Sequence, residues 1–428
     1  MTSSASALPP IHIQFDPPRE KARESFERLV SRSTYGHFSH PAKDLDTVMK
    51  DVLRPEREEG FYFLNEGALR ERVRFFQEHF LPDDPRRRIT YAVKANPRKR
   101  ILEIMADEGI DGFDCASLNE IRDAASIASP EELDIHYNHP IKKRTDIEAA
   151  YLMGVNYFTA QSRAGIDKIL DATNGPLLGS PEIAIRVATS NQSSQIKLSE
   201  KYGCSAPEAV RLLEYAEANG ARPALAMNMG SQNEQSKSYS DGVDLLTSIA
   251  KKVGGVHSIN LGGGMPVNYS KRDHFELENF LREMSSSSRR RAAELFGKKA
   301  ENPRIISEAG RSKVAEAIDL AIPVLERGID RIYFDDGVFG SFSDAAVHKW
   351  PYYFEVFMQN GRRPSAHKIP LTVYGNTCDS GDTLGQILLP RNIRPGDYLW
   401  VRNAGAYMDC QASRFNGLET ASYISYNI

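Results

Sequence analysis

Three short motifs along the sequence carry residues that could perform chemistry together. In the first, Lys94 follows an apolar run at 91–93 and precedes Pro97. A lysine whose stem is buried by such a run loses affinity for its proton, and its amine can then form a Schiff base with an aldehyde. An isolated lysine of this kind is more often an ordinary residue at the rim of a fold. The other motifs therefore decide whether Lys94 has a chemical role.

The second and third motifs could bind an anion and place a charge beside it. Three glycines at 262–264 leave backbone N–H groups open to an anion, although such runs also form plain flexible turns. Glu308 and Arg311 follow another apolar run, and alone they could form an ordinary ion pair. A phosphorylated aldehyde unites the three motifs, with Lys94 at its aldehyde, Arg311 near its phosphate and Glu308 near a ring nitrogen.

The rhythm of the chain after residue 60 explains how these motifs are brought together. Short apolar runs alternate with longer segments of helical spacing, which requires crossover connections and a parallel sheet. The expected strands are 89–93, 112–115, 134–137, 157–160, 183–188, 224–227, 257–261 and 305–307. Eight such units over about 245 residues have the size of a TIM-like (β/α)8 barrel, whose active site lies beyond the C-terminal strand ends. A doubly wound open sheet could also hold eight strands.

The chain on either side of this region has a different pattern. After about residue 316, strand-like runs lie between turn-rich segments, which predicts a C-terminal antiparallel β domain. Its expected strands are 331–334, 353–356, 369–373, 398–401 and 422–426. Helical patterns at 18–31 and 43–53 precede the barrel. The expected division is an N-terminal segment, a barrel and a β domain, at 1–64, 65–316 and 317–428.

Composition narrows the class of protein. The 428 residues include 54 basic and 57 acidic side chains, so the formal charge of −3 lacks the basic excess of a nucleic-acid binder. No apolar stretch approaches the ~20 residues of a membrane span, and the first residues do not resemble a secretory signal. Cys115, Cys204, Cys378 and Cys410 lie far apart without a CxxC pair, so neither a disulfide framework nor a metal site is expected. These features favour a cytoplasmic enzyme that acts on small molecules.

Seven ordered motifs resemble those of a known enzyme family. They are YAVKANP (91–97), GFDCAS (112–117), LGGGMP (261–266), EAGR (308–311), DDGVFGSF (335–342), NTCDSGD (376–382) and GAY…FNG (405–417). The chain resembles the fold-type III pyridoxal-phosphate enzymes, and within them the ornithine, lysine, arginine and diaminopimelate decarboxylases. The resemblance implies an alanine-racemase-like barrel whose C-terminal β domain is completed by N-terminal residues.

The resemblance also implies roles for individual residues. Lys94 would hold pyridoxal 5′-phosphate as an internal aldimine, and Glu308 would keep the ring nitrogen protonated. Cys378 would protonate Cα after CO2 leaves the external aldimine. The other implied cofactor-binding residues are Asp114, Arg186, Asn228, Ser231, Gly263, Gly264, Gly310, Arg311 and Tyr407. The implied substrate-binding residues are Asp379, His348 and Phe415.

The resemblance implies a homodimer as well. Cys378, Asp379 and Phe415 match residues that this family donates across a dimer interface. Neither active site would then be complete in a monomer. The expected partners are therefore a second copy of the chain and a small amino-acid substrate, with no nucleic acid and no membrane.

Two departures from the family pattern bear on the substrate. After the sixth strand the family has a histidine that stacks on the cofactor ring, where this sequence has Asn228, which lacks an aromatic face. Ornithine decarboxylases carry a Tyr-Asp pair soon after DGVYGSF, whose Asp binds the distal amine of the substrate. This sequence has Val347-His348 there, so Asp379 remains as a single carboxylate for a distal ammonium. An unpaired charge is costly to bury.

Three hypotheses remain open at this point. The leading one is decarboxylation of a basic amino acid such as ornithine or lysine. The second is another pyridoxal-phosphate reaction, or decarboxylation of an unusual amino acid in specialised metabolism, which Asn228 and Val347-His348 suggest. The third is a non-catalytic regulator, and the retained Lys94 and Cys378 argue against it.

Overall fold

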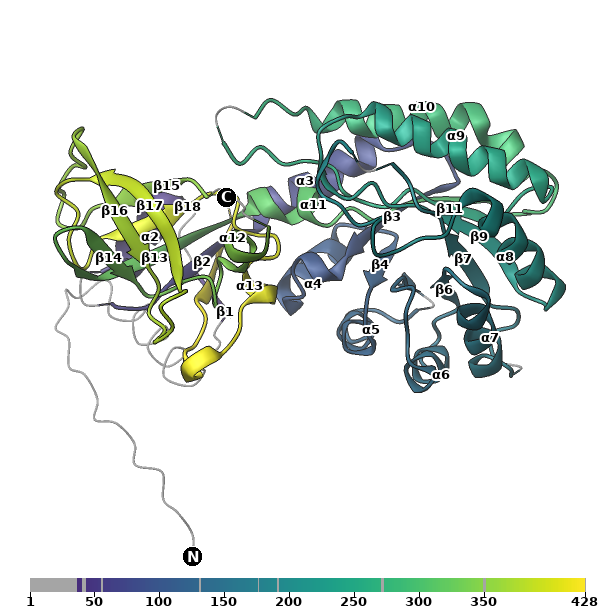
Figure 1. The fold of residues 1–428 in the computed structure, drawn as a ribbon, viewed down its shortest axis with the longest axis horizontal. Coiled ribbons are helices and arrows are strands. Elements are labelled where there is room, and N and C mark those ends of the chain that lie inside the picture. The colour runs from purple at the N-terminus through teal and green to yellow at the C-terminus, as the bar shows by residue number, and fades with distance from the viewer. Residues whose placement is uncertain are drawn as a thin grey trace, which may run out of the picture.

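The computed structural model of the chain has two parts, a closed barrel and a nine-stranded sheet (Figure 1). It describes residues 37–40, 44–54, 57–130, 132–175, 177–190, 192–270, 273–348 and 352–427. The helix expected at 18–31 lies outside these residues. Within the described part of the chain, no helix is long and apolar enough to cross a membrane.

Eight parallel strands form the barrel. They are β3 (Arg87–Ala92), β4 (Gly112–Cys115), β5 (Asp134–Tyr137), β6 (Tyr157–Ala160), β7 (Glu182–Arg186), β9 (Arg222–Ala226), β11 (Ser258–Asn260) and β12 (Arg304–Ser307). Each strand overlaps one of the eight expected runs. The barrel closes because β12 pairs with β3 in parallel, with Ile305 opposite Arg87. The barrel prediction is therefore confirmed, and the open-sheet alternative is excluded.

Amphipathic helices surround the barrel (Figure 1). They are α3 (Glu66–His79), α4 (Lys99–Asp107), α5 (Leu118–Ala125), α6 (Arg144–Leu152), α7 (Arg163–Ala172), α8 (Ala206–Ala218), α9 (Lys237–Lys252) and α10 (Leu277–Phe296). Serine side chains begin three of them, because Ser117, Ser162 and Ser205 each accept a hydrogen bond from a backbone N–H of the first turn. These caps fix where each strand-end loop stops and its helix begins.

The second part is a mixed sheet built from both ends of the chain. Its strands are β1 (His37–Ser39), β2 (Phe61–Asn65), β13 (Ile318–Arg327), β14 (Arg331–Phe334), β15 (Phe354–Phe357), β16 (Lys368–Tyr374), β17 (Thr383–Pro390), β18 (Tyr398–Val401) and β19 (Ser422–Tyr426). Strand β2 lies between β19 and β13, which confirms a β domain completed by N-terminal residues. The helix α2 (Leu45–Val52) matches the pattern at 43–53.

The sheet is mixed rather than antiparallel, and this corrects one expectation. The pairs β1–β19, β19–β2 and β14–β16 are parallel. A hairpin forces its two strands to be antiparallel, but strands joined by a long connection are free to pair in parallel. The strands β2 and β19 come from opposite ends of the chain, and β15 and a helix separate β14 from β16.

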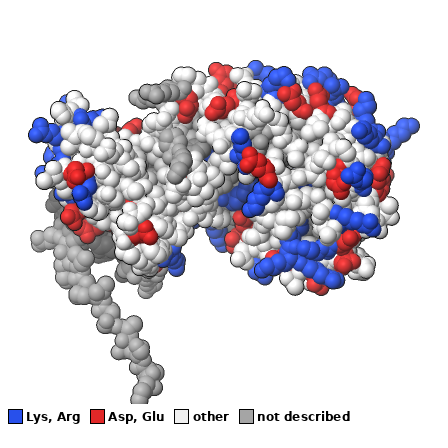
Figure 2. Space-filling view, viewed as in Figure 1, with Lys and Arg blue, Asp and Glu red and all other residues white. Residues whose placement is uncertain are grey.

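The two parts meet at the mouth of the barrel. The side-chain amide of Asn96, just after β3, donates to the Gly405 carbonyl and the Tyr423 hydroxyl, both at 2.9 Å. Arg98 donates two hydrogen bonds to Asp409, at 2.8 and 3.0 Å. In Figure 2 charged side chains of both signs lie over the barrel, while the middle of this face is mostly uncharged. The β domain is therefore held beside the strand end that carries Lys94.

Candidate active site

A cavity of about 270 Å³ opens at the C-terminal ends of the barrel strands. Strand-end loops, the two-stranded antiparallel sheet of β8 (Ser194–Ile196) and β10 (Ser231–Asn233), and two helices, α12 (Ser343–His348) and α13 (Met408–Gln411), surround it. Nine of the residues expected from the sequence line this one cavity. They are Lys94, Asp114, Arg186, Asn228, Ser231, Glu308, Arg311, His348 and Tyr407.

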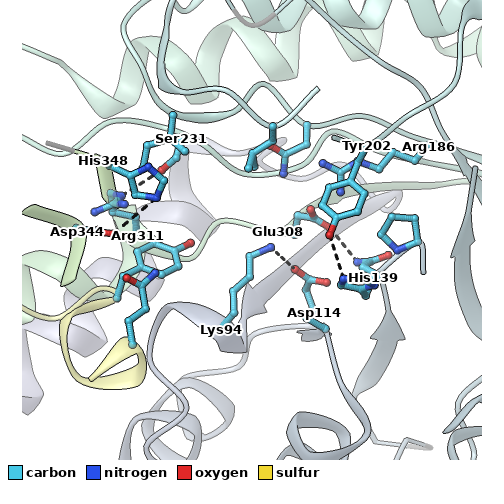
Figure 3. A pocket seen from close by; sticks show the side chains of 18 residues that line it. Lys94, Asp114, His139, Arg186, Tyr202, Ser231, Glu308, Arg311, Asp344 and His348 are labelled. Carbon is cyan, nitrogen blue, oxygen red and sulfur yellow. Dashed lines mark hydrogen bonds and ion pairs between the residues drawn. The ribbon is translucent and has the colours of Figure 1, made fainter. Parts of the chain in front are cut away.

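Lys94 stands in the middle of the cavity (Figure 3). A 3₁₀ turn at Val93–Ala95 directly follows β3 and presents the lysine, whose Nζ lies 3.9 Å from Oδ2 of Asp114. Its side chain keeps 42% of its accessible surface. Burial lowers the pKa of Lys94, but attraction to Asp114, Tyr407 and Glu308 outweighs burial, so its pKa lies above the ordinary value. The expected loss of proton affinity is therefore wrong for the protein alone.

Glu308 is a buried carboxylate just after β12. Its Oε2 accepts hydrogen bonds from the side-chain amides of Asn138, at 2.9 Å, and Asn260, at 2.7 Å. Burial, followed by repulsion from Asp114, raises the pKa of Glu308 to about 7. A carboxyl group with this pKa can share a proton with a ring nitrogen near neutral pH.

Arg311 forms a cationic end of the cavity, at the start of α11 (Arg311–Val314). Its Nη1 donates to the Tyr269 hydroxyl at 2.9 Å, and its Nε donates to the Ser231 hydroxyl at 3.3 Å. Its guanidinium lies 4.6 Å from the centre of the Tyr407 ring, and Tyr407 itself adopts a left-handed backbone with φ of 69°. A buried guanidinium beside two hydroxyls suits a phosphate group.

The predicted glycines lie beside the cavity rather than in its lining. Gly263, Gly264 and Gly310 are absent from the lining residues. Gly264 has a φ of +93°, and a Cβ there would collide with the carbonyl oxygen of Gly230. A Cβ on Gly310 would lie 2.8 Å from that of Ala95. These glycines let the strand-end loops pack closely behind the wall of the cavity.

Three other predicted residues lie outside the cavity of their own chain. Cys378, Asp379 and Phe415 are exposed, and none of them lines the cavity. The Cys378 backbone N–H donates to the Asn416 side chain at 2.9 Å. The Phe415 ring stacks on Phe339 with 4.8 Å between ring centres. Within one chain, the structure does not bring these residues to Lys94.

The sequence interpretation missed several lining residues, of which Asp344 is a buried carboxylate on α12. Asp344 and His348 are one helical turn apart, and Oδ1 of Asp344 lies 3.9 Å from Nε2 of His348. Burial raises the pKa of Asp344, while Arg311 and His348 oppose this. Val347 is 70% exposed and does not line the cavity. The i, i+4 spacing on a short helix was the available signal. The others are Ala116, Asn138, His139, Pro140, Ile196, Leu198, Tyr202 and Gln411.

The polar groups of the cavity fit pyridoxal 5′-phosphate. The cofactor has an aldehyde, a ring nitrogen and a phosphate, and the cavity holds an amine at Lys94, a proton-sharing carboxyl at Glu308 and a guanidinium at Arg311. Figure 3 shows Arg311 on one side of Lys94 and Glu308 on the other. These groups come from the ends of two neighbouring barrel strands, β3 and β12, and from the loop after β12.

Comparisons with known proteins give a matching family model and similar relatives. Residues 66–315 match the family described as pyridoxal-dependent decarboxylase, pyridoxal binding domain. A lysine/ornithine decarboxylase of Selenomonas ruminantium is 27% identical over 399 residues, which cover 91% of this chain and 94% of that protein. Antizyme inhibitor 2 of Xenopus laevis is 27% identical over 410 residues, which cover 88% of this chain and 83% of that protein.

A solved structure shares the fold over nearly the whole chain. It is a lysine/ornithine decarboxylase from Vibrio vulnificus complexed with cadaverine. The match has a TM-score of 0.75 at 25% identity, and it covers 90% of this chain and 99% of that one.

Proposed function

The chain belongs to the family of pyridoxal-dependent decarboxylases, and we propose that it removes the α-carboxylate of a basic amino acid such as ornithine or lysine. The convergence of Lys94, Glu308, Arg311 and Asp344 on one cavity carries this proposal. The first three suit the cofactor, and Asp344 suits a cationic group at the far end of a substrate side chain. In this proposal, residues 65–316 form the cofactor-binding barrel and residues 317–428 form the β domain.

The residues of the barrel divide the work of holding the cofactor and moving protons. Pyridoxal phosphate, when bound, supplies an electron-withdrawing ring that stabilises the negative charge left at Cα by departing CO2. Lys94 binds the aldehyde end and exchanges protons with the substrate amine. Glu308 holds the proton of the ring nitrogen. Arg311 and Ser231 bind the phosphate, and Asp114 orients the amine of Lys94.

The proton that replaces CO2 at Cα comes, in this proposal, from a second copy of the chain. Cys378 is exposed on the loop between β16 and β17, and this supports a role at an interface. A homodimer would bring the partner's Cys378, with the partner's Asp379 and the partner's Phe415, to the open side of the cavity. Each active site would then need both chains.

Asp344 supports a basic substrate, because it is a second carboxylate, besides Asp379, that could bind a distal ammonium. A distal ammonium that reaches Asp344 would add an opposite charge to this buried carboxylate, whereas an apolar side chain would add none. His348, one turn along the same helix face, lies beside this carboxylate. The position of Asp344 therefore supports a site for a cation at the α12 side of the cavity.

A substrate screen with a matched pair of variants tests the proposed function. The holoenzyme should release CO2 from ornithine, lysine or arginine in preference to neutral and acidic amino acids. In Asp344→Asn the KM for the preferred substrate should rise about tenfold to a hundredfold, because a hydrogen bond to a charged group is lost. Val347→Ala, next to the cavity wall on the same helix, should change nothing. Release of CO2 from no basic amino acid would contradict the proposal.

A second candidate is decarboxylation of an unusual amino acid, which His348 in the cavity favours. The same screen separates it from the first, because CO2 would then come from a neutral or partly acidic amino acid. A non-catalytic regulator would release CO2 from none. An absorbance band near ~420 nm that is lost in Lys94→Ala would exclude the regulator, since it reports a cofactor bound covalently to the lysine.

A further inference from the structure

The cavity wall across Lys94 from Arg311 carries two residues that the proposed function leaves unused (Figure 3). His139 follows β5, and Tyr202 lies in the loop between β8 and α8. Both line the cavity. Their rings meet edge to face with centres 5.5 Å apart, and the Tyr202 hydroxyl lies 3.3 Å from Nε2 of His139.

The direction of the hydrogen bond between them follows from the other nitrogen of His139. The backbone N–H of Ile141 donates to Nδ1 of His139 at 3.1 Å. A nitrogen that accepts carries no proton, so the neutral ring has its proton on Nε2. Burial lowers the pKa of His139, which favours this neutral form. Nε2–H therefore donates to the Tyr202 oxygen, and the Tyr202 O–H remains available to donate to another acceptor.

The backbone that carries both side chains is held by contacts within the loops. The His139 carbonyl accepts from the buried Lys142 ammonium at 2.7 Å, and that ammonium also donates to the Thr159 carbonyl. Gly203, directly after Tyr202, has a φ of +105°, and its N–H donates to the Gln161 side chain at 2.8 Å. Contacts within the protein therefore hold the backbone positions from which the pair extends.

Arg186 makes this side of the cavity suitable for an anion. Its guanidinium lies 5.3 Å from the centre of the Tyr202 ring, and it also lines the cavity. A guanidinium and a hydroxyl donor on the same wall of the cavity match an oxygen that carries negative charge. The Ser231–Arg311 site for the phosphate lies on the other side of Lys94 (Figure 3).

We propose that Tyr202 donates a hydrogen bond to an anionic oxygen bound beside Arg186, and that His139 is the positioning residue that orients the hydroxyl. The oxygen is either the ring oxygen of pyridoxal phosphate or the carboxylate of the amino acid. The inference rests on the proposed function, because it takes this cavity as the site of both molecules.

Two substitutions separate the donor from the residue that positions it. Tyr202→Phe removes the hydroxyl and keeps the ring over Arg186. His139→Asn keeps an acceptor for the Ile141 N–H but removes the donor to Tyr202. Each should weaken binding of the anionic oxygen about tenfold, because the lost bond is to a charged group. The double variant should be no weaker than Tyr202→Phe alone, since His139 acts through Tyr202.

The measurement uses the cofactor and the substrate in separate arms. Equilibrium dialysis and absorption spectra of the cofactor-free protein with pyridoxal phosphate give the cofactor Kd without substrate, and steady-state rates give the KM of the holoenzyme. A weaker Kd with a shifted absorption band identifies the ring oxygen. An unchanged Kd with a raised KM identifies the carboxylate. His139→Gln, whose amide can reach Tyr202, should recover binding to within about threefold.

Controls keep the test decisive. Tyr215→Phe removes a hydroxyl that donates to Asp167 at 2.5 Å and does not line the cavity, so it should change neither constant. Thermal unfolding should be the same for Tyr202→Phe and wild type. If Tyr202→Phe leaves both Kd and KM unchanged, the inference is wrong, and additive effects of the two variants would refute the positioning role. Failure of wild-type protein to bind pyridoxal phosphate would instead refute the proposed function.

Discussion

The proposed catalytic residues lie in two regions with different exposure to solvent. The barrel half is the cavity around Lys94, and the loop half is the β-domain loop at 376–382. Lys94, Glu308 and Arg311 converge on one cavity within a single chain. Cys378 and Asp379 lie exposed on the loop, outside that cavity. Under the proposed function, one chain would hold the cofactor by itself, whereas the proton for Cα would come from a second chain.

The exposed loop is nevertheless tied firmly to the β domain. Asp382 is 1% exposed, and its carboxylate accepts from the Val338 N–H at 2.8 Å. It also accepts from the N–H and hydroxyl of Thr377, at 3.1 and 2.7 Å. A loop shaped by a buried carboxylate can present Cys378 in one position to a partner, much as the barrel presents Lys94.

Removing the lysine of the cavity should have the largest effect. Lys94→Ala should lower CO2 release at least about 1,000-fold, because no other described residue that lines the cavity carries an amine. The absorbance band of the bound cofactor should disappear as well. Lys99→Ala, on the exposed face of α4, should keep full activity and the band. If Lys94→Ala still released CO2 at the wild-type rate, the proposed role of Lys94 would be wrong.

Comparing two exposed cysteines tests the loop half. Cys378→Ala should slow product formation about a hundredfold, the usual contribution of a general acid. The Cys410 thiol donates to the Lys94 carbonyl at 3.1 Å, so it serves as a comparison within the chain that carries the lysine. Cys410→Ala should lose less than about threefold, because an S–H group is a weak donor. The reverse order, in rates of amine formation, would place the acid in the same chain as the lysine.

Glu308 should make the stability of the cofactor-free barrel depend on pH. Its folded pKa of about 7 exceeds the ordinary 4.5, so the folded state binds the proton more tightly. This stabilises the fold fully below pH 4.5, and the contribution is lost as the pH rises toward 7. Glu308→Gln should remove this loss, which amounts to about 3 kcal/mol. Urea unfolding between pH 5 and pH 8 measures it, and parallel profiles for variant and wild type would contradict the assignment.

Loosening the exposed loop should have the smallest effect. Asp382→Asn keeps the size of the side chain but turns one acceptor into a donor facing N–H groups, which costs about 1–3 kcal/mol locally. Hydrogen exchange at 376–382 should therefore accelerate, and kcat should fall about three- to tenfold while the Kd for pyridoxal phosphate stays unchanged. Asp241→Asn, an exposed ion-pair partner of Lys237, serves as the control. Weaker binding of pyridoxal phosphate in Asp382→Asn would mean that the loop also contributes to the cofactor site.

The sequence alone predicted the barrel because its eight apolar runs and the helices between them are local patterns. Lys94 and Glu308 were found for the same reason, since each directly follows a strand. Asp344, His139 and Tyr202 were missed because loops and a short helix carry them, and tertiary packing brings them to the cavity.

Interactions between distant segments also explain the errors. Lys94 was expected to lose proton affinity from its local apolar run, but Asp114 and Glu308, from two other strand ends, reverse that effect. The sheet was expected to be antiparallel, but β2 enters it from the opposite end of the chain. Charges and strand partners that come from far along the chain leave no local pattern.

Mixing the two halves from different chains tests the central claim most directly. Lys94→Ala and Cys378→Ala chains, each with about 1% of wild-type activity or less as a homodimer, are co-expressed, and the CO2 released per dimer is measured. Random pairing makes about half of the dimers mixed, and each mixed dimer contains one site with Lys94 from one chain and the partner's Cys378. Activity should return to about a quarter of wild type, since one of two sites works in half of the dimers. Activity that stays at the level of the separate variants would contradict shared active sites.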